Sequence, residues 1–227
     1  MCIRDRARDR RIPTLAFTYN EPVIFYEYAL DTAVAGNKAG VHSVMISNGY
    51  IQPDPMKQLC EALSAVKVDL KAFTETFYRK YVRGELKPVL RTIELLQELG
   101  MHTEVVTLLI PGLNDSEAEI RALSRWLVKN IGPDVPLHFS RFHPAYKMSN
   151  LARNPVKTVV RAREIAVSEG VHYSYVGNVP GHPYESTYCH NCGKAIIERY
   201  GFYVRSVHIK DGKCEYCGTP IPGVWKA

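Results

Sequence analysis

The sequence predicts an α/β fold, in which six parallel strands alternate with helices, followed by a small four-cysteine module. Short apolar runs alternate with stretches of helical periodicity along most of the chain. Polar or glycine-containing segments follow one strand after another, at the end where α/β barrels build their sites. Two CxxC pairs near the C-terminus indicate a separate metal-binding module.

The expected strands are short and rich in β-branched or aromatic residues. They are 14–19, 43–47, 66–71, 103–110, 135–142 and 173–176. The expected helices cover 22–38, 55–64, 88–99, a segment beginning after 116, and 156–168. This alternation favours parallel strands joined by right-handed crossovers, which is compatible with a doubly wound sheet or with a barrel. No GxGxxG follows a strand, so a dinucleotide-binding fold loses support.

Local signals set the ends of two helices. Gly100 follows the helix 88–99 and is typical of a C-terminal stop. Ser116 and Glu119 match a capping box, in which the two side chains satisfy backbone N–H groups at the start of a helix.

The composition is that of an ordinary globular protein, with 227 residues, 46% hydrophobic residues and a formal net charge of +6. The basic residues are dispersed after residue 11, so we expect a solvated surface and no nucleic-acid partner. No apolar run reaches the roughly 20 residues of a membrane span, and no signal peptide is visible, so we expect a cytoplasmic protein without a membrane partner.

Residues 1–11 differ from the rest of the chain. MCIRDRARDRR alternates charges without an apolar period. We interpret it as a non-native leader, of the kind a translated sequencing-adapter junction gives; a genuine basic arm is the alternative. The native fold is then expected to begin near Ile12.

The C-terminal tail carries the strongest metal signal. Cys189, Cys192, Cys214 and Cys217 form two CxxC knuckles, each followed by glycine. Four thiolates on two tight turns suit a structural Zn²⁺ ion, with a rubredoxin-like iron as the minority interpretation. Two disulfides would require an oxidising compartment that nothing supports. Cys60 is expected to be a buried structural thiol.

Polar residues at the strand ends are the candidates for a binding site. Asn20 and Glu21 close the first strand, although a helix start explains them equally well. Asn48 stands in an Asn-Gly turn after the second strand. Asp69 and Lys71 lie two residues apart, so they share one face of the third strand. A buried pair of this kind is costly unless it is used or mutually satisfied.

The motifs together carry a family resemblance. TYNEP, SNGY, VDLKAF, TLLIPGLNDS, PLHFSRFHPAYKM, YVGNVPG, TYCHNCG and CEYCG follow one another in this order. This series resembles the radical S-adenosylmethionine (SAM) protein of the AmmeMemoRadiSam system, which is related to pyruvate formate-lyase activating enzymes. The resemblance covers about residues 12–224.

The resemblance implies a partial (β/α)6 TIM-like barrel over 12–180 and a zinc-ribbon or rubredoxin-like module over 181–227. It also implies a [4Fe-4S] cluster and SAM, which is cleaved to a 5′-deoxyadenosyl radical that abstracts hydrogen from a substrate. The residues it places in the SAM pocket are Asn20, Glu21, Asn48, Asp69, Lys71 and His143. Asn20 and Glu21 would lie near the methionine ammonium, and Lys71 would hold the carboxylate. Arg141 is a looser candidate.

One departure from the family is an absence. The sequence contains no CxxxCxxC, the motif that holds the cluster. We therefore expect an N-terminally truncated chain without its first barrel strand and cluster loop, which is inactive alone.

Two other functions stay open on the sequence. The first is a natural non-catalytic module that keeps the SAM pocket and the zinc ribbon. The second is an unrelated barrel enzyme, such as a lyase, that uses Asp69 and Lys71. The substrate is not identified. A protein substrate, as for an activase, and partners from the same gene cluster are expectations of the family only.

Overall fold

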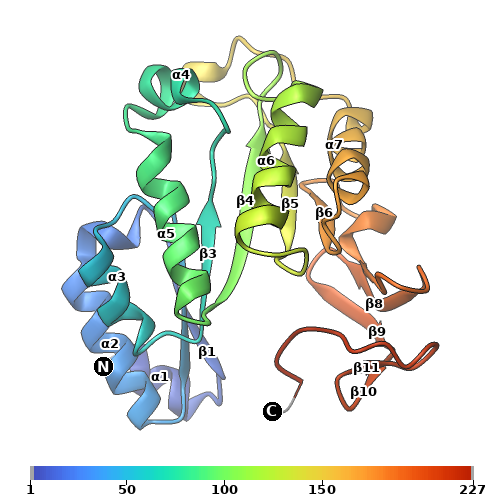
Figure 1. The fold of residues 1–227 in the computed structure, drawn as a ribbon. Coiled ribbons are helices and arrows are strands. Elements are labelled where there is room, and N and C mark those ends of the chain that lie inside the picture. Colours follow the sequence, from blue (N-terminus) through green and yellow to red (C-terminus); the bar gives the residue numbers. More distant parts are fainter. Residues whose placement is uncertain (1–2, 226–227) are drawn as a thin grey trace. The chain divides into compact units, whose positions relative to one another are not determined.

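Six parallel strands form the sheet of the computed structural model, which describes residues 3–225 (Figure 1). Their order in the sheet follows the sequence. They are β1 (Thr14–Phe17), β2 (His42–Ser47), β3 (Ala65–Asp69), β4 (His102–Leu109), β5 (Leu137–Arg141) and β6 (Ser174–Gly177). This is the sheet of a partial barrel, and it confirms the predicted fold class.

The chain divides into two compact units. The first contains the described residues up to Lys71 together with Tyr78–Val105, and the second contains Ala72–Phe77 together with the residues from Val106 onward. Strand β4 contributes residues to both. None of the helices among residues 3–225 is long and apolar enough to cross a membrane.

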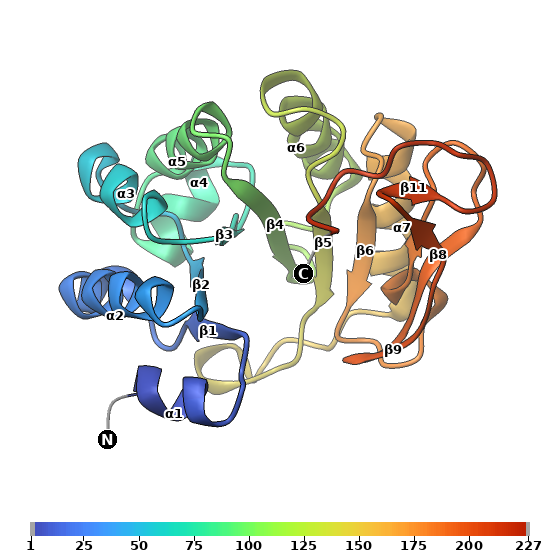
Figure 2. The same cartoon turned by 90° about the horizontal axis from the view of Figure 1, so that it is seen from below.

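In the first unit, helices lie along the parallel strands β1, β2 and β3 (Figure 2). They are α1 (Ile3–Asp9), the 3-10 turn η1 (Pro22–Phe25), α2 (Tyr26–Lys38), α3 (Pro53–Cys60), the π-helical segment η2 (Tyr78–Val82) and α5 (Leu86–Glu98). Alternate residues of the strands are buried, among them Met45, Val66 and Val68, because successive side chains point to opposite faces.

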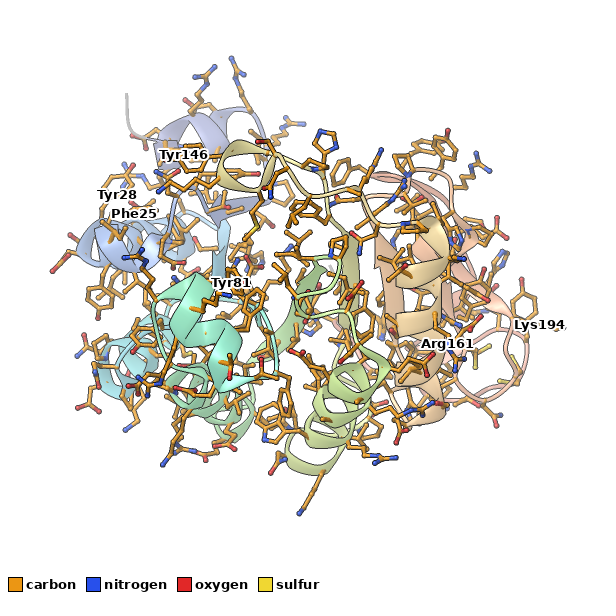
Figure 3. The ribbon with its side chains drawn as sticks, turned by 90° about the horizontal axis from the view of Figure 1, so that it is seen from above. Phe25, Tyr28, Tyr81, Tyr146, Arg161 and Lys194 are labelled. Carbon is orange, nitrogen blue, oxygen red and sulfur yellow. The ribbon has the colours of Figure 1, made fainter. Side chains whose placement is uncertain are left out.

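The predicted helix 22–38 begins differently from the expectation. Pro22 opens a 3-10 turn, and the α-helix starts only at Tyr26. Phe25 and Tyr28 meet edge to face across this junction, with ring centroids 6.4 Å apart (Figure 3). The helix expected at 55–64 covers Pro53–Cys60, and η2 was not expected at all.

Residues Ile3–Asp9 form the helix α1, although no element was expected before Ile12. Ala7 of α1 is 2% exposed and packs with Leu15 and Val41. Its packing shows that a charged stretch without apolar periodicity contributes one small side chain to the core.

The second unit pairs β5 and β6 in parallel and packs α7 against both. Its other elements are α4 (Glu75–Phe77), α6 (Glu117–Asn130), η3 (Tyr146–Met148), α7 (Val156–Ser168) and η4 (Pro183–Glu185). Beyond them lie β7 (Thr187–Tyr188), β8 (Ala195–Tyr200), β9 (Tyr203–Val207), β10 (Ile209–Lys210) and β11 (Lys213–Cys214), which make two small antiparallel sheets.

Only half of the predicted capping box forms at α6. Ser116 Oγ accepts the N–H of Glu119 at 3.3 Å, as expected. The Glu119 carboxylate instead accepts the N–H of Phe73 at 2.7 Å, and its partial burial raises its pKa. Glu119 therefore holds the segment Ala72–Phe77, a contact between residues far apart in sequence. The expected stop at Gly100 is confirmed by its φ of 66°.

Candidate functional site

Glu21 stands at the end of β1 and organises the turn after β2. Its Oε1 accepts the hydroxyl of Ser47 at 2.6 Å, and its Oε2 accepts the backbone N–H of Asn48 at 2.8 Å. Oε1 also lies 3.4 Å from the N–H of Val23, so Glu21 caps the turn η1. The carboxylate is therefore largely used within the protein, and it fixes Asn48 next to the end of β1.

The turn after β2 is tightly defined. Asn48 Oδ1 accepts the N–H of Tyr50 at 2.7 Å, and Ser47 Oγ accepts the N–H of Gly49 at 3.1 Å. Ser47 is only 2% exposed, so its hydroxyl depends on Glu21 for a partner. The side-chain amide nitrogen of Asn48 makes no hydrogen bond among residues 3–225 and can donate to a ligand.

Gly49 is required by this turn, and its replacement gives the first prediction. Its φ is 72°, and an added Cβ would lie 2.8 Å from Val68 Cγ1. Gly49→Ala should therefore lower the free energy of unfolding by about 2–4 kcal/mol, from backbone strain plus overpacking. Urea denaturation measures this loss.

Gly40→Ala is the matched control for Gly49→Ala. Gly40 has a φ of 71° but open space around its Cα. It should cost only the backbone strain, about 1 kcal/mol. Equal losses in the two variants would show that the contact with Val68 does not constrain the turn.

Asp69 and Lys71 pair at the end of β3, as their spacing predicts. Lys71 Nζ lies 2.7 Å from Asp69 Oδ2, with 39% of the Lys71 side chain and 29% of the Asp69 side chain exposed. A half-exposed pair contributes little to stability, about 1 kcal/mol or less. Both charged groups are therefore accessible from solvent.

Tyr78 contacts the backbone of Lys71 and was not predicted as a site residue. It is 1% exposed, and its hydroxyl oxygen accepts the backbone N–H of Lys71 at 3.2 Å. Burial raises the pKa of Tyr78 to about 12, and the nearby charge of Asp69 acts in the same direction. No local pattern around Tyr78 predicts this contact, because the side chain meets the end of β3 only in the folded chain.

The other predicted residues are less constrained. Asn20 is exposed and makes no side-chain hydrogen bond among the described residues. His143 is exposed after β5 and belongs to the second unit. Arg141 is committed within that unit, since its Nε donates to the carbonyl of Asn154 at 2.6 Å. The structure thus brings together Glu21 and Asn48, and Asp69 and Lys71.

The four tail cysteines converge, as predicted. Cys189 Sγ lies 3.7 Å from Cys217 Sγ, and Cys192 Sγ lies 3.8 Å from Cys214 Sγ. A tetrahedral ion with metal–sulfur bonds of about 2.3 Å places its ligands about 3.8 Å apart. The thiolates therefore fit one mononuclear ion, which leaves no coordination position open.

The two knuckles have the same backbone hydrogen bonds. Gly193 N–H donates to Cys189 O at 2.9 Å, and Gly218 N–H donates to Cys214 O at 2.8 Å. Hydrogen bonds from Thr219 lower the pKa of the Cys217 thiol to about 6. Lys194, after the first knuckle, places its Nζ 4.6 Å from the centre of the ring of Tyr216 in the second. The backbone hydrogen bonds and the contact between Lys194 and Tyr216 define the geometry of the two knuckles.

The metal module shares a core with the strand before it. Cys189 and Cys214 are 2% and 1% exposed and pack with Tyr173, Ile196 and Ile221. Tyr173 stands directly before β6, so the knuckles are anchored on the second unit. Cys60 lies far along the chain from them and is half-buried, which raises the pKa of its thiol to about 11.

Residues 3–123 match the family described as the Radical SAM superfamily. The chain belongs to this superfamily. A solved domain of a pyruvate-formate lyase-activating enzyme from Bacteroides vulgatus has a similar fold, with a TM-score of 0.65, 15% identity, and coverage of 72% of this chain and 98% of that one. Streptococcus suis SuiB bound to S-adenosylmethionine gives a TM-score of 0.62 at 10% identity, covering 77% of this chain and 41% of that one.

Two curated proteins are similar in sequence. An uncharacterized protein of Methanocaldococcus jannaschii, MJ0808, is 40% identical over 211 residues, which is 92% of this chain and 62% of that protein. The benzylsuccinate synthase activating enzyme of Thauera aromatica is 23% identical over 170 residues, 66% of this chain and 51% of the enzyme. The chain thus spans between half and two thirds of the length of these relatives.

Proposed function

We propose that this chain supplies the SAM-binding part of a radical SAM enzyme of the AmmeMemoRadiSam type. The observation that carries the proposal is the placement of Glu21, Asn48, Asp69 and Lys71 at the carboxyl ends of β1–β3. When bound, SAM supplies the 5′-deoxyadenosyl radical that abstracts hydrogen from a substrate in this superfamily. We propose a protein as the substrate, as for an activating enzyme. This proposal rests on the similarity to the Thauera activating enzyme.

The charges at the strand ends suit the amino-acid end of SAM. That end carries an ammonium, which requires an anionic partner, and a carboxylate, which requires a cationic or amide partner. Asp69 Oδ1 makes no hydrogen bond among residues 3–225, so Asp69 is the better partner for the ammonium. Lys71 and the amide of Asn48 suit the carboxylate. Glu21 acts through Asn48, since its own oxygens are already used; Asn20 and His143 complete the proposed set.

Lys71→Ala tests this assignment and gives the second prediction. We expect SAM binding, measured by equilibrium dialysis, to weaken about tenfold or more, because a charged hydrogen bond contributes about 1.5–3 kcal/mol. Lys57→Ala is the matched control, since Lys57 pairs with Asp54 at 3.3 Å on the exposed face of α3. Equal affinities for the two variants, or no measurable binding by the unaltered chain, would refute the pocket.

The residues present do not fit the iron–sulfur cluster of the superfamily. The sequence has no CxxxCxxC. The four tail thiolates lie 3.7 and 3.8 Å apart in pairs, too close for ligands that each bind a different iron of a cubane. We therefore propose that the chain alone does not cleave SAM reductively.

We propose Zn²⁺ as the ion of the four-thiolate site, with iron as the alternative, because both fit a closed S4 site. A ribbon over 181–227 would then fold around its ion. Reduced thiols are expected in the cytoplasm, where we place the protein.

The lack of CxxxCxxC also favours a second candidate function, a non-catalytic module that binds SAM. Both functions predict SAM binding through Lys71. They differ in whether a chain that also carries the motif produces 5′-deoxyadenosine.

A further inference from the structure

A second group of metal-ligating side chains lies beside the first knuckle. Asp134, His172 and His190 each place one ligand atom within 4.8 Å of the others. Asp134 precedes β5, His172 precedes β6, and His190 stands between Cys189 and Cys192. The group therefore joins three segments of the second unit that are distant in sequence.

The backbone under this group is fixed by hydrogen bonds. His172 N–H donates to Pro133 O at 2.8 Å, which ties the two loops together. Leu137 N–H donates to Tyr173 O at 2.9 Å at the start of the paired strands. His190 is held by the knuckle itself. A binding site on such a rigid frame loses little entropy when a ligand orders it.

The outward Nε2 atoms of both imidazoles are available because each Nδ1 is hydrogen-bonded. His172 Nδ1 lies 2.8 Å from Asp134 Oδ1, and His190 Nδ1 lies 2.8 Å from the Tyr173 hydroxyl. Neither Nε2, nor Asp134 Oδ2, has a hydrogen-bond partner within residues 3–225. An oxygen bonded to one ring nitrogen is the arrangement that orients histidines toward metal ions.

The two rings stack face to face, with centroids 4.3 Å apart and an angle of 8° between their planes. Parallel rings point their lone pairs side by side, so binding requires one ring to turn slightly toward the other while its Nδ1 hydrogen bond is kept. The His172 side chain is 36% exposed and that of Asp134 is 51% exposed, which leaves room for this turn. Solvent then fills the remaining coordination positions.

We propose that His172 and His190 bind one divalent transition-metal ion of the Zn²⁺ or Ni²⁺ kind through their Nε2 atoms, while Asp134 orients His172 through its Nδ1. This ion is separate from the ion of the four thiolates. Imidazole nitrogen is a ligand that such ions prefer, whereas Mg²⁺ and Ca²⁺ prefer oxygen ligands. The ion would fasten the first knuckle to the loops before β5 and β6.

The test is calorimetric titration of Ni²⁺ into the full chain, with its four-thiolate site already loaded with Zn²⁺. We expect one saturable site with micromolar affinity and no release of zinc. His172→Ala should weaken binding about tenfold or more, and Asp134→Asn, which keeps the side-chain shape, should weaken it less. Unchanged zinc content shows that each variant is folded around its knuckles.

His208→Ala is the matched control. His208 Nδ1 lies 3.3 Å from Glu215 Oε2. Among the described residues, His208 belongs to no group of metal-ligating side chains. It should bind Ni²⁺ like the unaltered chain. Three results would overturn the proposal: equal affinity in His172→Ala, displacement of zinc by nickel, or no saturation below about 1 mM.

Discussion

Replacing Cys214 with serine is expected to empty the four-thiolate site and to unfold the small sheets around it. Cys214 is 1% exposed and packs with Ile196 and Ile221. So few apolar residues cannot stabilise a segment of this size, whereas a structural Zn²⁺ contributes about 10–16 kcal/mol of binding free energy. The metal content measured by mass spectrometry should fall from about one ion per chain to almost none.

Limited proteolysis should report the structural consequence of Cys214→Ser. New cleavage is expected between β7 and β11, because the two small sheets lose the metal ion that holds them together. Cys60→Ser is the matched control, since Cys60 is half-buried on α3 and belongs to no metal-ligating group of the described residues. It should retain the ion. A Cys214→Ser protein with a full equivalent of metal would show that the thiolates are not the ligands.

The parts of the fold that local patterns control were predictable. The alternation of apolar runs and helical stripes located the six strands, and Asp69 and Lys71 share a face because side chains alternate along a strand. The CxxC spacing predicted the convergence of the four cysteines, since each knuckle is a local turn.

Contacts between distant residues could not be predicted in the same way. Glu119 looked like the second half of a capping box, but a backbone N–H from Phe73 is its partner. Glu21 looked like a ligand residue, yet its carboxylate reaches the turn 26 residues further on, at Ser47. Neither hydrogen bond leaves a local sequence signal, because the two partners of each bond meet only when the chain folds.

The same reason explains the residues that were missed. Tyr78 reaches the backbone of Lys71 through η2, a segment without a recognisable periodicity. His190 meets Tyr173 because the knuckle packs on the start of β6. Motif spacing finds groups that one turn or one strand brings together, and it does not find groups that packing brings together.

The chain alone is expected to produce no 5′-deoxyadenosine. Reductive cleavage in the superfamily requires a cluster held by CxxxCxxC, and that motif is not in this sequence. The four tail thiolates do not substitute for it, because their spacing fits one ion and all four are used. Loss of the electron source should abolish the reaction, whereas loss of one pocket residue only weakens binding.

The most direct measurement uses the chain after anaerobic reconstitution with iron and sulfide, followed by SAM and dithionite, with 5′-deoxyadenosine quantified by chromatography. A pyruvate formate-lyase activating enzyme treated in parallel is the positive control. We predict bound SAM, no cubane absorption spectrum and no 5′-deoxyadenosine from this chain. A [4Fe-4S] spectrum together with catalytic formation of 5′-deoxyadenosine would contradict this prediction.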